Sequence, residues 1–285
     1  MKLRKLVMAV AVAIGLAVAG PVAAASADSA PSVPPIQENP APLGANDWNC
    51  KPSKEHPRPV ILMHGFLAPA AGHFSAYSPY LKAQGYCVFT GTYGTIKDVP
   101  LVNLLGGLQP IEYSATQLRN FVDKVLGATG AKQVDIVGHS EGGIVPRYYI
   151  KNLGGADKVH NFVSWGPPNH GLTISGLYTL AEKLVPGLDT KLLPSICKVC
   201  SELTNGTGFI DQLNAGNEAP GNIHYTVIAS IHDEFVTPYT TSFLKGSNVD
   251  NITLQDVSPQ SFGEHIGMAF DTGVWKITDK ALQRN

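Results

Sequence analysis

The segment from Gly138 to Gly142 reads GHSEG and places Ser140 between two glycines directly after an apolar run. A serine hydroxyl becomes a nucleophile only when a base removes its proton and a third group orients that base. The run QVDIV before the segment predicts a strand, and IVPRYYIKNL after it predicts a helix. A G-x-S-x-G turn from strand to helix exposes the serine where the helix N–H groups favour negative charge. We therefore interpret Ser140 as a candidate nucleophile.

The candidate base is a histidine late in the chain, because this kind of turn is followed first by the acid and then by the histidine. His160, His170 and His224 lie within or beside predicted strands or a predicted insertion, before any suitable acid. His265 instead follows the last apolar run, on a loop that leads into a terminal helix. We predict that His265 is the general base.

The candidate acid lies in the loop IHDEFVTPY, which follows the predicted strand HYTVIAS. This loop offers two carboxylates, Asp233 and Glu234. We prefer Asp233, because it comes first after the strand and its short side chain is easily held against the Nδ1 atom of an imidazole.

An oxyanion hole needs two backbone N–H donors, one after the nucleophile and one from the loop after an early strand. Glu141 supplies the first. The second comes from the loop after VILM, where we choose Phe66, because Gly65 lets the main chain approach closely. His64 precedes Ser140 and is interpreted as a brace for this loop and not as a base.

Short apolar, β-branched runs alternate with helical patterns through most of the chain, which predicts βαβ crossovers and a mainly parallel sheet flanked by helices. The predicted strands are residues 59–63, 86–90, 133–137, 159–165 and 224–229. Between them, residues 111–126 carry an apolar stripe with helical spacing, and Gly127 is expected to end that helix. The fold class is therefore α/β.

The long interval between the last two of these strands predicts an inserted cap or lid, at about residues 168–218. Within it, residues 172–185 repeat an apolar side chain every three or four positions: Ile174, Leu177, Leu180 and Leu184. This spacing predicts an amphipathic helix. The pattern alone does not distinguish a lid from an ordinary core helix.

The first residues, MKLRK, are basic, and a short apolar run and small residues follow them. This order predicts a secretory signal peptide over residues 1–27, and the apolar run is too short for a membrane anchor, the alternative. Residues 28–47 are rich in proline and alanine and predict an extended lead-in. We expect residues 48–285 to form one exported domain with no membrane span in the mature protein.

Four cysteines in an exported protein favour disulfides, and four allow three pairings. A bridge between Cys50 and Cys87 would pin the N-terminal arm to the sheet. Cys197 and Cys200 form a CxxC, which could be a local disulfide, a redox site or half of a zinc site. We favour the local disulfide, because there is no second CxxC and no thioredoxin-like context.

The composition of the 285-residue chain is that of an ordinary globular protein, with 44% hydrophobic residues, 15% charged residues and a net charge of −1. This charge gives no support for binding to nucleic acid or to an anionic membrane. No motif indicates a metal or an organic cofactor. We expect a monomer.

Several motifs taken together resemble the secreted actinobacterial lipases of the class 2 lipase group, which have the α/β-hydrolase fold. The resemblance runs from about Trp48 to the C-terminus and rests on HGF, GHSEGG, GPPNHG, CKVC, DEFVTPY and HIGMAFD. It implies a Ser140–His265–Asp233 triad, with the Phe66 and Glu141 amides as the oxyanion hole. It also implies the disulfides Cys50–Cys87 and Cys197–Cys200.

Two positions depart from the pattern of that family. Gly166 and Pro167 occupy a loop that often has threonine before the proline and lines the pocket mouth, which leaves the shape of the pocket open. Glu141 replaces a commonly neutral residue, and the sequence does not say whether its carboxyl reaches solvent or affects substrate choice.

The expected function is that of a secreted serine hydrolase acting on lipid esters of the triacylglycerol type through an acyl-enzyme. The alternatives on the same triad are a short-chain carboxylesterase, a thioesterase and a peptidase. A non-catalytic exported binding protein is disfavoured, because no member of the triad is missing from the sequence.

Overall fold

The computed structural model describes residues 33–96, 102–187, 191 and 193–284. The predicted signal peptide, residues 1–27, lies outside the described residues. The described part of the lead-in lies in an antiparallel arrangement beside the residues that follow the second strand. There Gln37 and Thr92 exchange backbone hydrogen bonds of 2.9 and 2.7 Å, and the side chain of Ile36 is buried. The lead-in therefore contributes to the core, which its composition did not predict.

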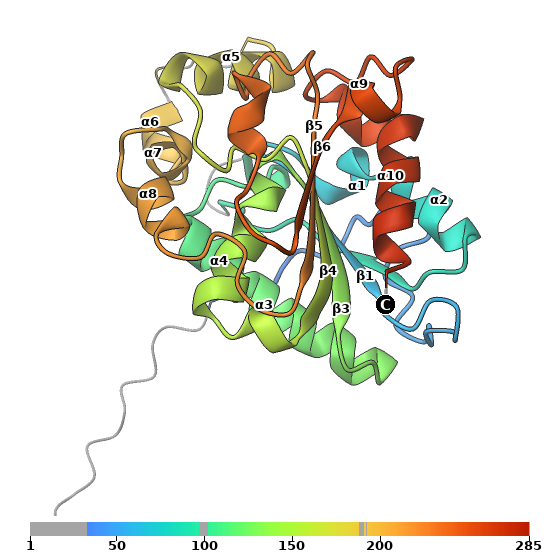
Figure 1. Ribbon diagram of the computed structural model, residues 1–285. Coiled ribbons are helices and arrows are strands. Elements are labelled where there is room, and N and C mark those ends of the chain that lie inside the picture. Colours follow the sequence, from blue (N-terminus) through green and yellow to red (C-terminus); the bar gives the residue numbers. More distant parts are fainter. Residues whose placement is uncertain (1–32, 97–101, 188–190, 192, 285) are drawn as a thin grey trace, which may run out of the picture. The chain divides into compact units, whose positions relative to one another are not determined.

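The strands that the structure describes form one six-stranded sheet in the order β2-β1-β3-β4-β5-β6, and every neighbouring pair is parallel (Figure 1). This confirms the α/β fold class. The strands are β1 (Val60–Met63), β2 (Val88–Thr90), β3 (Val134–His139), β4 (Val159–Trp165), β5 (His224–Ala229) and β6 (Val249–Thr253).

Helices cover both faces of the sheet, as the βαβ pattern requires. The α-helices are α1 (Ala70–His73), α2 (Tyr77–Ala83), α3 (Ile111–Thr129), α4 (Val145–Asn152), α5 (Ile174–Leu184), α6 (Leu193–Ile196), α7 (Cys200–Leu203), α8 (Phe209–Asn214), α9 (Leu254–Val257) and α10 (Thr272–Leu282). Short 3₁₀ turns are η1 (Val102–Leu104), η2 (Ser140–Gly143), η3 (Gly155–Asp157), η5 (Tyr239–Ser242) and η6 (Gly267–Phe270).

Two apolar cores form because successive strand residues point to opposite faces of the sheet. Ile61 and Met63 of β1 pack with α3 and α4, whereas Val60 and Leu62 pack with α2 and α10 (Figure 1). Because these strands are buried on both faces, their sequences are continuous apolar runs.

Helix α3 is longer than the sequence pattern predicts. Gly127 lies inside it, and the helix continues to Thr129. Gly130 ends it instead, with a left-handed φ of 75° and an N–H that donates to the carbonyl of Leu126. The prediction that Gly127 ends the helix was therefore wrong, because a glycine without a left-handed φ only weakens a helix.

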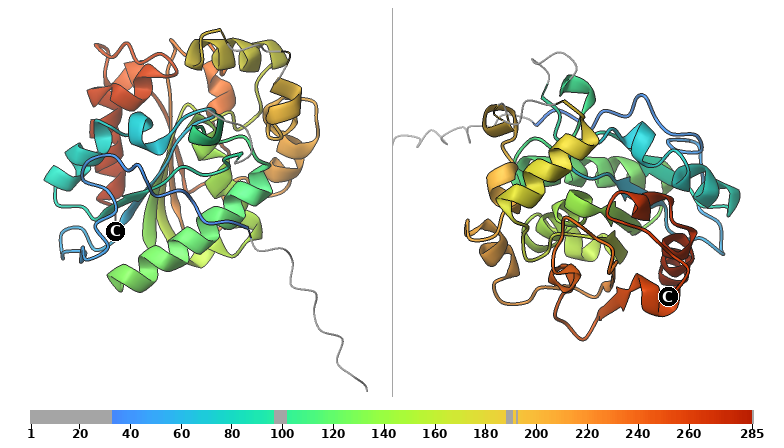
Figure 2. Two further views of the ribbon diagram at one scale, coloured as in Figure 1. Left: turned by 180° about the vertical axis from the view of Figure 1, so that it is seen from behind. Right: turned by 90° about the horizontal axis from the view of Figure 1, so that it is seen from above.

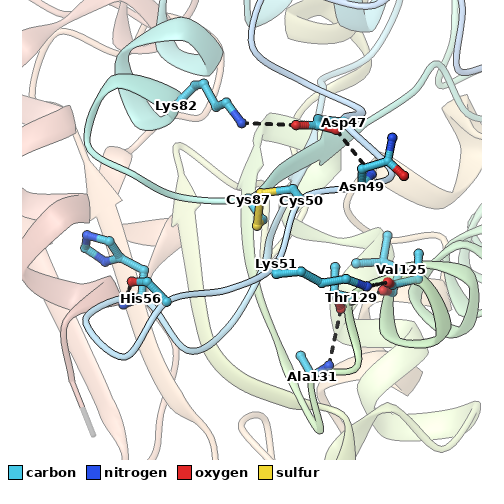
Figure 3. Close-up of a disulfide and its surroundings, with 12 residues drawn as sticks. Asp47, Asn49, Cys50, Lys51, His56, Lys82, Cys87, Val125, Thr129 and Ala131 are labelled. Carbon is cyan, nitrogen blue, oxygen red and sulfur yellow. Dashed lines mark hydrogen bonds and ion pairs between the residues drawn. A yellow bond between two sulfur atoms is a disulfide. The ribbon is translucent and has the colours of Figure 1, made fainter.

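A disulfide joins Cys50 to Cys87 at the start of β2, with a Cα–Cα distance of 5.7 Å (Figure 3). The ion pair of Lys82 with Asp47 lies beside it, and Lys51 donates to the carbonyl of Ala128 at the end of α3. These contacts tie the N-terminal arm to both faces of the sheet.

The interval between β4 and β5 holds α5 to α8, which lie together at one side of the sheet (Figures 1 and 2). Helix α5 confirms the predicted amphipathic helix: Leu177 and Leu180 are buried, although Ile174 is 54% exposed. The second disulfide, Cys197–Cys200, joins the end of α6 to α7. None of the described helices is both long and apolar enough to cross a bilayer.

Candidate active site

The carboxyl ends of the parallel strands bring the predicted site residues together. Met63 of β1 pairs with Gly138 of β3, so the loop after β1 lies beside the turn that carries Ser140. Asp233 follows β5, and His265 lies beyond β6 and α9. Side chains that are distant in the sequence therefore meet at one edge of the sheet, where ligands bind in α/β folds.

The turn at Ser140 is strained, because Ser140 has a φ of 56°, in the left-handed region. The two flanking glycines make this turn possible. A Cβ atom at Gly138 would lie 1.9 Å from the carbonyl oxygen of Gly142, and one at Gly142 would lie 2.2 Å from the carbonyl oxygen of Met63. Any larger residue at either position would force the turn apart.

The structure differs from the prediction in how the chain leaves this turn. Ser140 begins the 3₁₀ turn η2, and α4 follows only from Val145, with Pro146 in its first turn. The N–H of Ile144 donates to the carbonyl of Glu141 and closes η2. The free N–H groups of η2, and not those of α4, therefore lie next to the nucleophile.

Ser140, His265 and Asp233 form one chain of hydrogen bonds. Oγ of Ser140 lies 2.9 Å from Nε2 of His265, and Nδ1 of His265 lies 2.8 Å from Oδ2 of Asp233. A carboxylate can only accept, so we assign the Nδ1 proton to the imidazole, which leaves Nε2 free to accept from the serine hydroxyl. This is the arrangement that general-base activation of a serine requires.

The structure also separates the two carboxylates that the sequence offered. Asp233 is 6% exposed, and its Oδ1 accepts the backbone N–H groups of Phe235 and Val236 at 3.0 and 2.9 Å. Glu234 points the other way: its Oε2 accepts the backbone N–H of His265, and its Oε1 pairs with Lys183 on α5. Only Asp233 contacts the imidazole ring.

The loop after β1 packs directly against the nucleophile. A Cβ atom at Gly65 would lie 3.2 Å from Cβ of Ser140, so glycine is what lets the Phe66 backbone come this close. The next residue, Leu67, has a left-handed φ of 53°. His64 does not join the triad, because Nδ1 donates to the carbonyl of Gly65 and Nε2 accepts from the N–H of Tyr93.

Two further histidines, His139 and His73, support the backbone of His265 through hydrogen bonds, and the sequence did not predict this role. Nε2 of His139 donates to the backbone carbonyl of His265 at 2.8 Å, so Nδ1 of His139 must accept, and Nε2 of His73 donates to it at 2.9 Å. Burial lowers the pKa of His139 well below its ordinary value and that of His73 to about 3, which keeps both rings neutral. Nothing in the sequence around His73, on α1, indicated this contact.

Gly166 lies beside the hydrogen bond between Asp233 and His265. It follows β4, which lies between the nucleophile strand and the acid strand. A Cβ atom there would lie 3.0 Å from Oδ2 of Asp233 and 3.3 Å from Nδ1 of His265. Gly166 thus leaves room for the hydrogen bond between acid and base, where a threonine at this φ of 50° would crowd it.

The cavity beside Ser140 is small in this structure. Leu180 and Leu184 of α5 line a cavity of about 30 Å³ over Ser140 and His265. This space suits a few water molecules and is far smaller than the ~300 Å³ or more of a typical ligand pocket. Ser140 is correspondingly only 4% exposed. An ester therefore needs more space beside the hydroxyl than this structure leaves.

Comparison with known proteins adds to this geometry. A family model described as "Lipase (class 2)" matches residues 57–272. A triacylglycerol lipase of Pseudarthrobacter phenanthrenivorans is 26% identical over 160 residues, which cover 54% of this chain and 47% of that protein. A lysosomal thioesterase of Xenopus laevis is 25% identical over 140 residues, covering 49% and 45% respectively. This chain thus spans about half the length of the relatives that it matches.

Solved structures share the fold. Lipase B of Aspergillus fumigatus has a TM-score of 0.62 at 19% identity, over 86% of this chain and 55% of that one. A Bacillus licheniformis lipase in its mature form has a TM-score of 0.58 at 15% identity, over 81% of this chain and 94% of that one. Both likenesses concern the α/β arrangement of sheet and helices.

Proposed function

This chain belongs to the class 2 lipase family, and we propose that it is an exported serine hydrolase that cleaves carboxylic esters, with lipid esters as its substrates. The observation that carries the proposal is the hydrogen-bond chain from Ser140 through His265 to Asp233. Within this family, such a chain at the carboxyl ends of the strands favours acyl transfer to serine over a purely structural role.

In the proposed mechanism, Oγ of Ser140 attacks the carbonyl carbon of the ester while Nε2 of His265 removes the hydroxyl proton. The same imidazolium then donates that proton to the leaving alcohol, and the acyl group stays on Ser140. Asp233 remains ionised, holds the Nδ1 tautomer and stabilises the positive ring. Its own position is fixed by the two backbone N–H groups that its Oδ1 accepts.

The N–H groups of Phe66 and Glu141 form the proposed oxyanion hole. Each such donor contributes roughly 3 kcal/mol to transition-state stabilisation in serine hydrolases. Support comes from the close packing of the Phe66 loop against Ser140 and from the start of η2 at the nucleophile. Water, activated by His265, then attacks the acyl-enzyme and releases the carboxylic acid.

Lipid substrates are favoured by the way that α5 covers the site. Its inner face carries Leu177, Leu180 and Leu184, and the last two line the cavity over the triad. When α5 moves away, these leucine side chains become exposed to water, and contact with an oil surface would stabilise them. We propose that residues 168–218 form this cap and that α5 is its lid.

The substrate class is tested with emulsified long-chain triacylglycerols and soluble short-chain esters, assayed with the mature protein. We expect both to be hydrolysed, with a rise in activity when a short-chain ester exceeds its solubility and forms droplets. Hydrolysis of the soluble esters alone would support the short-chain carboxylesterase alternative and contradict the lipid proposal.

A second candidate, thioester hydrolysis, is favoured by the similarity to a protein named lysosomal thioesterase. The triad chemistry is the same for a sulfur leaving group. Acyl thioesters matched in chain length to the oxygen esters distinguish the two, because the enzyme's preference appears directly as a ratio of kcat/KM values.

Export is proposed from the basic and apolar start of the chain together with the two disulfides, Cys50–Cys87 and Cys197–Cys200. Disulfides persist in oxidising compartments outside the cytosol. We also propose that the protein acts as a monomer and that the catalytic cycle needs no cofactor, since the mechanism above uses only side chains and water.

Lys183 fastens the proposed lid, and replacing it with methionine should raise activity on a soluble ester. Lys183 lies on α5 and pairs with Glu234 beside the acid and with Glu264 beside the base, the latter at 3.2 Å. Exposed ion pairs contribute about 0.2–1 kcal/mol each, so we expect the loss of both pairs to increase kcat/KM by between about twofold and about thirtyfold. High salt should have the same effect on the unaltered protein.

Lys82→Met serves as the matched control, because Lys82 also forms an exposed ion pair, with Asp47, but lies on α2 (Figure 3). Its kcat/KM should keep the salt response of the unaltered protein. If Lys183→Met and Lys82→Met behave alike, the ion pairs of Lys183 do not hold the lid.

A further inference from the structure

The carboxyl group of Glu141 is buried directly behind the site, which answers what the sequence left open. Glu141 is 0% exposed, and neither carboxyl oxygen has a hydrogen-bond partner among the residues that the structure describes. A buried carboxylate without donors is strongly unfavourable, whereas the neutral acid is tolerated. Burial accordingly raises the pKa of Glu141 well above its ordinary value of 4.5.

The carboxyl lies against the loop that carries the Phe66 amide. Gly107, with a left-handed φ of 67°, leaves the space for it: a Cβ atom there would lie 2.4 Å from Oε2 of Glu141 and 3.1 Å from Cα of Phe66. The side chain of Glu141 thus fills the volume behind one proposed oxyanion donor, while its own backbone N–H is the other.

The polar groups around this carboxyl give it no positive partner. Tyr93 from the loop after β2 faces it, but the Tyr93 hydroxyl donates to the carbonyl of His64 at 2.8 Å. His64 stacks on Tyr93, and its burial lowers its pKa to about 4, so it is neutral. Glu202 from α7 is the charged group that acts on Glu141, and its negative charge raises the pKa of Glu141 further.

We propose that Glu141 is a positioning residue that works only as the neutral acid, and that its ionisation as the pH rises loosens the oxyanion loop and stops hydrolysis. This inference rests on the proposed function. An ionised Glu141 would draw the Tyr93 hydroxyl proton away from the carbonyl of His64, which lies two residues before Phe66 in the loop. It would also place a negative charge beside the developing oxyanion.

Glu141→Gln is the matched variant, because the amide has the same shape and cannot ionise. The pKa of Glu141 is higher in the folded protein than in the unfolded chain. Its contribution to stability is therefore intact below about pH 4.5 and is lost as the pH rises toward the folded-state value. The unfolding constant of the unaltered protein, relative to that of the variant, should grow by up to about tenfold per pH unit across this window.

The activity readout uses kcat/KM for a soluble ester on the same samples, from about pH 5 to about pH 9. The ratio of Glu141→Gln to the unaltered protein should rise with pH, through kcat more than through KM, because the loop acts on the transition state. Glu55→Gln, at an exposed position, controls for removal of a carboxylate and should show neither trend.

If the ratio of the two unfolding constants, of the unaltered protein and of Glu141→Gln, does not change with pH, the proposal is overturned, because Glu141 then ionises normally. A stability ratio that changes while the activity ratio stays flat would overturn the positioning role. If no ester is hydrolysed at all, the proposed function fails, yet the unfolding data still report on the carboxyl.

If Glu141→Gln does not fold, infrared spectra of the unaltered protein show instead whether the carboxyl group of Glu141 stays protonated. We expect the carbonyl band of a protonated carboxyl group to persist to a higher pH than the bands of exposed carboxyl groups, because burial raises the pKa of Glu141. Loss of every such band at the pH where exposed carboxyl groups ionise would overturn the proposal.

Discussion

Ser140→Ala should lower kcat for ester hydrolysis by about a million-fold, the size of effect seen when a serine nucleophile is removed from a triad. The reason is that His265 and Asp233 have no other hydroxyl to activate: the chain of hydrogen bonds ends at Oγ of Ser140. The measurement is hydrolysis of a soluble ester by the purified variant, with circular dichroism as the check on folding.

A small residual rate is compatible with this account, because the oxyanion donors and substrate binding remain. The variant should also bind a non-hydrolysed ester analogue about as well as the unaltered protein. Substantial turnover by well-folded Ser140→Ala, above any contaminating esterase, would contradict the assignment of the nucleophile.

Asp233→Asn should lower kcat by about 10⁴-fold, through the wrong tautomer of the base. Oδ1 of Asp233 accepts two backbone N–H groups, from Phe235 and Val236. An asparagine must place its amide oxygen there, so its NH₂ group faces Nδ1 of His265. The imidazole then carries its proton on Nε2, where it meets the hydroxyl of Ser140 and cannot accept from it.

Glu234→Gln is the comparison that separates the two adjacent carboxylates. Its amide oxygen can still accept the backbone N–H of His265, as Oε2 of Glu234 does. We expect no loss comparable with that of Asp233→Asn, measured as kcat on the same ester, although Glu234→Gln also removes one ion pair of Lys183. Equal losses for the two variants would show that Asp233 has no special role as the acid.

Strands β1 to β5 and the positions of Ser140 and Asp233 could be predicted from the sequence because each rule is local. Strands buried on both faces give apolar runs, and both residues closely follow a strand. Strand β6 (Val249–Thr253) was not predicted, because its residues are half-buried or exposed and give no apolar run. His265 was predicted instead from its order in the chain, after the acid. The amphipathic helix was predictable from a local rule, since residues three and four apart share one face.

The supporting contacts were not predictable, because they join segments by tertiary packing alone. The hydrogen bonds from His73 through His139 to the carbonyl of His265 connect α1, β3 and the loop after α9. Similarly, the sequence did not show that Gly166 lies beside the hydrogen bond between acid and base.

Glu141 illustrates the same limit at a single position. A glutamate is normally expected at the surface, so the sequence could not show that its side chain turns into the space left by Gly107. Likewise, the hydrogen-bonding pattern that ends α3 at Gly130 and not at Gly127 depends on a φ value that the residue type permits but does not impose.

The most direct measurement is covalent labelling with a lipid-like fluorophosphonate, followed by mass-spectrometric mapping of the modified peptide. This probe reacts with a hydroxyl that a base activates, so we expect the adduct on Ser140, with labelling slowed strongly in His265→Ala and Asp233→Asn. An adduct on a different residue, or labelling that does not depend on His265, would contradict the account.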